Sequence, residues 1–324
     1  MIYFWLGFIL LIMVLLALDL GVFHRKIHRV SSREAILWTI FWVSLAMLFN
    51  VFIYFAYTYH WFGIGLSPYY EQSGKEAAFK FFTGYVIEES LSLDNIFVMA
   101  LIFSYFKVPA KYQHRVLFWG ILGAQIMRGV MILAGIALIN KFSWMIYLLG
   151  ILLIFTALRM LVNKQQSFDP DKNILVRIAR KIYPVASEYN GPKFFSRVDG
   201  QKAITPLFLV LLIIESTDIL FAIDSIPAIF AITTDPYIVF TSNIFAILGL
   251  RSLYFALASM LDKFRYLKVS LVFILIYVGI KMLLSHSYKI PILISMSIIA
   301  GMLSIGIFTS IVATHSEKKS VAAK

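Results

Sequence analysis

The chain has 324 residues, of which 60% are hydrophobic and only 14% are charged, and its mean hydropathy is +0.84. A soluble domain of this length has about 25% charged residues, so the composition excludes a soluble globular domain and a disordered chain. Because the chain contains no cysteine, it offers no disulfide, no thiolate metal ligand and no thiol redox chemistry of its own. The formal net charge is +12, and its meaning depends on where the basic residues lie along the chain.

Apolar stretches long enough to cross a bilayer dominate the sequence. A membrane-spanning helix needs about 20 mostly apolar residues. We predict an all-α, polytopic transmembrane protein that forms a single integral membrane domain over residues 1–324. Its nine predicted spans are residues 2–22, 35–57, 80–103, 116–139, 144–162, 205–231, 240–261, 269–284 and 291–314.

Basic residues predict the orientation of these spans. The first span has no basic residue before it and is followed by Arg25, Lys26 and Arg29, the reverse of a cleaved signal peptide. We therefore expect a retained helix with its N-terminus outside, and nine spans then place the C-terminus in the cytoplasm. Of the Lys and Arg residues, 21 lie in the predicted cytoplasmic loops and tail and 4 lie outside, as the positive-inside rule requires. Loop 163–204 holds 8 of them, but no cluster there is dense enough to favour binding of anionic lipid over this explanation.

Ionisable residues also lie inside the predicted spans. A charge at mid-membrane costs about 3 kcal/mol on insertion scales, so each needs a partner, a proton or a water-filled cavity. For Asp19, pairing with nearby basic residues at the membrane interface is as good an interpretation as a functional role. The other embedded acids are Glu88, Glu89, Asp94, Glu215, Asp218 and Asp224, and the embedded bases are Arg128, Arg159, Arg251 and Lys281.

The six deeper acids form two clusters with the same spacing. Glu88 precedes Asp94 by six residues, Asp218 precedes Asp224 by six, and a small polar residue, Asn95 or Ser225, follows each second acid. One interpretation is that the acids only neutralise the buried bases. Six acids exceed four bases, however, and this surplus indicates a cation site.

Helical spacing divides these residues between faces. Glu88, Ser92 and Asn95 lie on one face, as do Glu215, Asp218 and Ser225 in the second cluster. At about 100° per residue, Asp224 points away from Glu215 in an unbroken helix. Either the two acids serve different partners or the helix is interrupted near Pro227, because a proline lacks the N–H of the helical hydrogen bond.

An internal repeat joins the two clusters. Spans three to five and spans six to eight carry the same order of an acid pair, an arginine and an Arg/Lys-Met-Leu end. Repeat one covers residues 80–162 and repeat two covers residues 205–284, on either side of loop 163–204. Three spans per unit place the second copy in the opposite orientation, which is the inverted-repeat architecture of secondary transporters.

The candidate ligands are all oxygen atoms. No histidine lies deep in a predicted span and there is no cysteine, so a soft-metal site is disfavoured and Mn²⁺, Mg²⁺ or Ca²⁺ is favoured. Carboxylates in a low dielectric also bind protons readily, so a proton and a cation can compete for one site. The chain lacks a GxxxxGK[ST] phosphate-binding loop, which argues against ATP-driven pumping.

Three segments resemble the TerC/Alx family of integral membrane proteins. They are IEESLSLDNIF at 87–97, PLFLVLLIIESTDILFAIDSIPAIFAIT at 206–233 and SNIFAILGLRSLYF at 242–255. LDLGVFHRK at 18–26, FFSRVDG at 194–200 and GIKMLL at 279–284 agree with the same family. The resemblance extends from about residue 3 to residue 314.

The resemblance implies export of manganese, coupled to protons or to the membrane potential. It also implies inverted repeats like those of the lysine-exporter superfamily and a link to tellurium resistance, and some members are labelled redox modulators. The acidic motifs of the family fall on the six deeper acids, and Asn95 and Ser225 match as well.

We therefore expect a non-enzymatic inner-membrane transporter that exports Mn²⁺, with no resident cofactor and no nucleic-acid partner. Glu88, Asp94, Asp218 and Asp224 are the predicted metal residues. The predicted supporting or proton-linked residues are Glu89, Ser92, Asn95, Glu215, Ser225 and Asp19, and the predicted charge-balancing residues are Arg128, Arg159, Arg251 and Lys281. The alternatives are a membrane scaffold in a stress response and an exporter of another cation such as Ca²⁺. The oligomeric state stays open.

Overall fold

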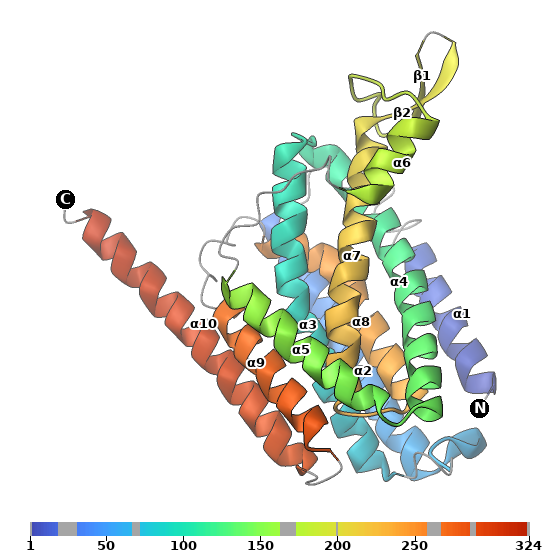
Figure 1. Ribbon diagram of the computed structural model, residues 1–324, viewed down its shortest axis with the longest axis vertical. Helices are drawn as coiled ribbons and strands as arrows, with labels where there is room; N and C mark the ends of the chain where they lie inside the picture. Colours follow the sequence, from blue (N-terminus) through green and yellow to red (C-terminus); the bar gives the residue numbers. More distant parts are fainter. Residues whose placement is uncertain are drawn as a thin grey trace.

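The structure is a computed structural model, which describes residues 2–18, 31–66, 72–162, 173–198, 200–257, 267–285 and 290–322. Helices dominate these residues (Figure 1). The helices are α1 (Ile2–Leu18), α2 (Ser32–Thr58), α3 (Gly74–Tyr105), α4 (Ala110–Lys141), α5 (Met145–Val162), α6 (Ile174–Ile182), α7 (Pro206–Phe230), α8 (Pro236–Leu257), α9 (Leu267–Leu283) and α10 (Ile292–Ala322). Two short strands, β1 (Phe195–Val198) and β2 (Gln201–Ile204), form an antiparallel hairpin.

Each of the nine predicted spans overlaps one of these helices, which confirms a polytopic helical membrane protein. By length and composition, α2, α4, α7, α8 and α10 can each cross a membrane, and α1, α5 and α9 are shorter apolar helices. At 32 residues α3 is long enough to cross as well, but three acidic residues interrupt its apolar sequence. The last helix continues to Ala322, beyond its predicted end at residue 314.

Serine caps explain where two of the long helices begin. The Ser31 hydroxyl accepts a hydrogen bond from the backbone N–H of Glu34, and the Ser73 hydroxyl accepts one from the N–H of Glu76. Both pairs have the Ser-x-x-Glu spacing of a capping box, which satisfies N–H groups that have no partner within the helix. Because of these caps, α2 and α3 each begin with a polar first turn, and their apolar segments follow it.

Loop 163–204 contains structure that the sequence analysis did not predict. Helix α6 and the β1–β2 hairpin lie within it, at one end of the bundle (Figure 1). The Tyr189 hydroxyl donates to the carbonyl of Phe106 at 2.7 Å, and the Arg115 guanidinium lies 5.1 Å from the centre of the Phe194 ring. These contacts hold the segment over the connection between α3 and α4.

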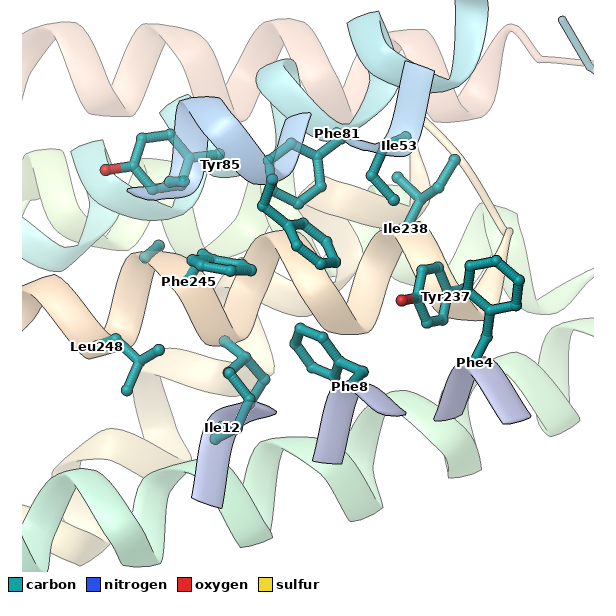
Figure 2. Close-up of a cluster of buried hydrophobic side chains, with 14 of the residues drawn as sticks. Phe4, Phe8, Ile12, Ile53, Phe81, Tyr85, Tyr237, Ile238, Phe245 and Leu248 are labelled. Atoms are coloured by element: carbon teal, nitrogen blue, oxygen red, sulfur yellow. The ribbon is translucent and has the colours of Figure 1, made fainter. Parts of the chain in front are cut away.

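An aromatic cluster joins α1 to the rest of the bundle. Phe8 of α1 packs against Phe49 of α2 and Phe245 of α8, with ring centres 5.5 and 6.0 Å away. Figure 2 shows Phe8 and Phe245 in this cluster. Phe81 of α3 lies 6.1 Å from the same Phe245 ring. Aromatic pairs in these tilted and edge-on arrangements add about 0.5–1.5 kcal/mol each beyond the area they bury. The apolar side chains of α1 that face inwards therefore position it against α2 and α8.

Helix pairing follows the order expected of an inverted repeat. The two predicted repeats correspond to α3–α5 and to α7–α9. The first helix of each repeat packs against the second helix of the other, α3 against α8 and α7 against α4. Helix α3 also packs against α7, α4 against α8, and α5 against α9. The inverted repeat stays a prediction, which these pairings support.

The α5–α9 contact depends on two glycines. A Cβ atom added at Gly279 would lie 2.8 Å from the carbonyl oxygen of Gly150, and one added at Gly150 would lie 3.0 Å from the carbonyl oxygen of Gly279. Small residues of this kind let two membrane helices approach closely. The backbones of α5 and α9 could not keep this distance with larger side chains.

We predict that Gly279→Ala lowers the melting temperature of the purified protein in detergent, because overpacking of this kind costs about 1–3 kcal/mol. Gly301→Ala is the matched control, since a Cβ atom there meets nothing within 4 Å. It should leave the melting temperature unchanged or raise it, because alanine favours a helix. Equal melting temperatures for the two variants would contradict the close-packing interpretation.

Candidate functional site

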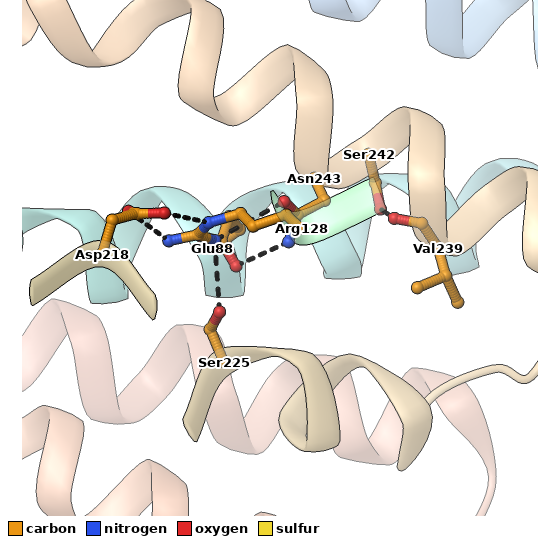
Figure 3. Close-up of polar contacts among 7 residues, drawn as sticks. All are labelled: Glu88, Arg128, Asp218, Ser225, Val239, Ser242 and Asn243. Carbon is orange, nitrogen blue, oxygen red and sulfur yellow. Dashed lines mark hydrogen bonds and ion pairs between the residues drawn. The ribbon is translucent and has the colours of Figure 1, made fainter. Parts of the chain in front are cut away.

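Arg128 lies at the centre of the candidate site. It extends from α4 and is 1% exposed. Its Nε donates to Asp218 Oδ2 at 3.0 Å and its Nη2 donates to Asp218 Oδ1 at 2.9 Å, a two-pronged ion pair with α7 (Figure 3). Its Nη1 donates to a carboxylate oxygen of Glu88 on α3. One guanidinium thus holds an acid from each of the two predicted clusters.

Two polar side chains complete the contacts of Arg128. Nη1 also donates to the Ser225 hydroxyl at 3.2 Å and to Asn243 Oδ1 at 3.5 Å (Figure 3). Asn243, on α8, donates through Nδ2 to the second oxygen of Glu88 at 2.9 Å. The site therefore joins α3, α4, α7 and α8. Ser225 lies seven residues after Asp218, on the face of α7 that helical spacing predicts for both.

Charge is unbalanced at this site. Glu88, Asp218 and Arg128 are all buried, and two carboxylates face one guanidinium. Removing one partner from a buried ion pair leaves an uncompensated charge, whereas an additional positive charge is favoured where carboxylates are in surplus. A proton or a cation can supply that charge.

Asp224 has a different partner. Its Oδ1 accepts a hydrogen bond from the Thr156 hydroxyl of α5 at 2.9 Å, and Arg159 on the same helix also interacts with its carboxylate. Helix α7 is continuous from Pro206 to Phe230, with Pro227 inside its last turn. Of the two explanations for the spacing of the acids, the structure therefore supports different partners rather than an interrupted helix. Helix α3 is likewise continuous across its acids.

Glu89 and Glu215 lie on the same two helices as Glu88 and Asp218 but contact other neighbours. Glu89 Oε2 is buried and has no hydrogen-bond partner, and its Oε1 would lie 3.9 Å from a Cβ atom added at Gly249 of α8. Glu215 packs directly against α4, because a Cβ atom at Gly123 would overlap its carboxylate. Neither acid takes part in the contacts described for Arg128.

The remaining predicted residues are distributed around this centre. Ser92 and Asn95 are buried on α3, and an oxygen of each lacks a hydrogen-bond partner. Asp94 is half-buried, about 120° around α3 from Glu88. Arg251 is buried on α8, and Lys281 is half-buried on α9. Asp19 lies outside the described residues.

The predicted metal set is not gathered into one site. Among the residues that the structure describes, no group of three or more His, Asp or Glu side chains is placed to hold a metal ion. Glu88 and Asp218 converge, but Arg128 lies between them, and Asp224 lies on a face of α7 that points to α5. In this conformation the four predicted metal residues, Glu88, Asp94, Asp218 and Asp224, therefore lie at more than one place, and their assignment to the metal pathway stays a prediction.

Sequence reasoning missed Asn243, Thr156 and Asp235. Asn243 and Thr156 are uncharged. A single uncharged polar residue in an apolar helix is common and does not by itself indicate a functional site. Asn243 lies on the same helix as Arg251, eight residues before it. The charge-balancing role predicted for Arg251 did not indicate that Asn243 contacts Arg128. Asp235 lies between two predicted spans, yet it is 5% exposed.

Asp235 anchors a polar network at the start of α8. Its Oδ2 accepts hydrogen bonds from the Tyr57 hydroxyl at 2.8 Å and from Gln72 Nε2 at 3.0 Å, and its Oδ1 accepts one from the N–H of Tyr237 at 2.9 Å. Lys80 Nζ donates to Gln72 Oε1 at 2.6 Å. Burial raises the pKa of the Asp235 carboxyl, and these hydrogen bonds offset part of the rise. The network ties α2, α3 and α8 together at the end of the bundle away from α6.

Together the fold and the site define an integral membrane protein with an acid-rich polar centre inside a helical bundle. The chain belongs to the TerC family of integral membrane proteins, whose pattern it matches over residues 73–318.

Relatives match along almost the whole chain. An uncharacterized membrane protein of Myxococcus xanthus is 48% identical over 308 residues, which cover 95% of this chain and 92% of the relative. The Escherichia coli K12 protein named as a candidate membrane-bound redox modulator, Alx, is 42% identical over 301 residues, covering 92% and 91%. Its namesake in Salmonella typhi is 41% identical over 325 residues, covering 99% and 97%. No solved structure matches the chain significantly.

We predict that Arg128→Gln destabilises the protein by about 3–5 kcal/mol, because it leaves two buried carboxylates without their counter-charge. Thermal unfolding of the purified protein in detergent measures the effect. The triple variant Glu88→Gln, Arg128→Gln, Asp218→Asn removes all three charges and should regain much of the loss. Equal stability of the single variant and the unaltered protein would contradict the central role of this ion pair.

We predict that Asp235→Asn lowers stability by about 1–3 kcal/mol, because both oxygens of Asp235 accept hydrogen bonds. In either orientation the new amide N–H₂ would face a donor, on Tyr57 and Gln72 or on the backbone N–H of Tyr237. Glu76→Gln is the control. Glu76 forms a partly exposed ion pair with Lys80, and such pairs contribute about 0–1 kcal/mol. Melting curves at constant pH compare the two variants, and a larger loss for Glu76→Gln would refute the importance assigned to Asp235.

Proposed function

We propose that this protein is a transporter in the bacterial inner membrane that exports Mn²⁺ in exchange for protons, with its N-terminus outside and its C-terminus in the cytoplasm. The observation that carries the proposal is the buried convergence of Glu88 and Asp218 on one arginine. An acid surplus inside a membrane bundle is energetically unfavourable unless a proton or a cation neutralises it.

The contacts of Arg128 suggest how one pair of acids could serve two occupants. In the conformation described, Arg128 holds both carboxylates. A divalent cation that approached Glu88 and Asp218 would compete with the guanidinium for the same oxygens. The unpartnered oxygens of Ser92 and Asn95, one and two turns along α3 from Glu88, would supply further ligands. Protonation of the acids would favour release of the cation, which is the basis of exchange.

The donor set favours a hard cation. Carboxylate, amide and hydroxyl oxygens suit Mn²⁺, Mg²⁺ and Ca²⁺, and the chain has no cysteine. Manganese is chosen among these because the family resemblance implies it. Export of Ca²⁺ is the second candidate, because the same oxygens suit it.

A role in a stress response forms a different class of function. The relatives named Alx are labelled as candidates for redox modulation. The chain has no thiol, so a redox role here would act through another group or through a partner. Such a scaffold would tolerate neutral substitutions of the embedded acids but would depend on loop 163–204.

Flux through proteoliposomes tests the transport proposal. Purified protein should move Mn²⁺ across the membrane when a pH gradient is imposed, and parallel assays with Mg²⁺ and Ca²⁺ should show less flux. We expect Glu88→Gln and Asp218→Asn to reduce Mn²⁺ flux by at least about tenfold, because each removes a charge that the cation needs. Glu188→Gln, an exposed acid outside the helices, is the matched control and should transport normally.

In whole cells, Asp94→Asn and Asp224→Asn should cause manganese to accumulate under manganese load. Normal efflux by both variants would remove these two acids from the pathway. Absence of Mn²⁺ flux from proteoliposomes that contain folded protein would refute the proposal itself.

A further inference from the structure

Helix α6 presents three chemically different faces. It has the sequence ILVRIARKI over Ile174–Ile182 and contains no acidic residue. Val176 and Ala179 point into the bundle, where they join a hydrophobic cluster with residues of α3, α4, α7 and α8. The other two faces are exposed, one apolar and one basic.

The start of α6 is tied to the side of a membrane-spanning helix. Asn173 accepts hydrogen bonds from the N–H groups of Leu175 and Val176, which caps α6. Its Nδ2 donates to the Ser216 hydroxyl at 2.6 Å. Ser216 lies ten residues inside α7, about 15 Å along its axis from its first residue. Helix α6 therefore runs beside the first half of α7, and not beyond its end (Figure 1).

The apolar face consists of isoleucines spaced four residues apart. Ile174, Ile178 and Ile182 are 69%, 48% and 64% exposed. Residues with this spacing form a row along one side of a helix. Such a row is unfavourable in water, but beside a membrane-spanning helix it meets acyl chains instead.

The basic face lies next to this row. Arg177, Arg180 and Lys181 are exposed and follow the isoleucines around the helix. An apolar row adjoined by basic side chains is the pattern of helices that lie in the plane of the membrane interface. Lys and Arg side chains near the membrane surface are attracted to anionic phospholipid headgroups.

We propose that α6 is an interfacial helix whose isoleucine row enters the acyl region of one leaflet and whose Arg177, Arg180 and Lys181 bind anionic phospholipid headgroups. The proposal depends on the bundle being embedded in a membrane and does not depend on the identity of any transported ion. It assigns to loop 163–204 a lipid surface that charge density alone did not indicate.

Single-cysteine labelling tests the depth of the helix, because the chain contains no cysteine that would also react. A nitroxide is attached at Ile178→Cys or, as a control, at Lys202→Cys on the exposed edge of the hairpin. In nanodiscs, the label at 178 should be relaxed by dissolved oxygen and shielded from a water-soluble nickel chelate. The label at 202 should show the opposite preference.

Two results at position 178 would overturn the proposal. Nickel accessibility equal to that at 202 would place the helix in water. Shielding from both oxygen and nickel would show that a protein surface, from a partner or a second copy, covers the row.

Neutralisation of the basic face tests the headgroup contact. The variant Arg177→Gln, Arg180→Gln, Lys181→Gln is compared with Lys193→Gln, Arg197→Gln, Lys202→Gln, which removes three charges from the exposed turn and hairpin. Retention of phosphatidylglycerol is measured by native mass spectrometry, with phosphatidylcholine as the uncharged reference. We expect at least about a tenfold loss of phosphatidylglycerol affinity in the α6 variant and a smaller change in the other. Equal affinities in the two variants would refute the headgroup contact.

Discussion

The burial of Arg128 between Glu88 and Asp218 is the constraint on which the rest of the structure depends. Three charges in a low-dielectric interior are tolerated only when they satisfy one another. Arg128 comes from α4, and its acids come from α3 and α7, so the ion pair requires these helices to meet. Asn243 of α8 joins the same contact through Glu88. Electrostatics thus determines which helices surround the centre, and apolar packing fills the space around them.

A second polar contact lies on the other side of α7. Asp224 meets Thr156 of α5, and α5 packs closely on α9 through Gly150 and Gly279. Because α7 is continuous, its two acids can face two different helices, and no break in the backbone is needed. One continuous helix therefore makes both the central contact and the lateral contact.

The two ends of the bundle use different chemistry. At one end, Asp235 accepts hydrogen bonds from a tyrosine, a glutamine and the backbone of α8 in a buried network. At the other end, α6 leaves isoleucines and basic residues exposed beside α7. A buried carboxylate must satisfy its hydrogen bonds within the protein, whereas an exposed apolar row beside a membrane helix depends on lipid. Asp235 and α6 both lie within residues 73–318, the part of the chain that matches the family pattern.

The sequence by itself determined the spans, the class of protein and the residues that carry buried charge. Hydropathy over about 20 residues reports directly on transfer into a bilayer, and an ionisable residue in such a stretch is conspicuous because it is costly. It also showed that Asp224 and Glu215 differ in direction. Only the tertiary structure decided which acids share a partner, because that depends on how helices distant in sequence pack. The tertiary structure separated Asp224 from Asp218, placed Arg128 between Glu88 and Asp218, and buried Asp235 outside the predicted spans. It also packed α6 against α7 through apolar contacts and a hydrogen bond from Asn173.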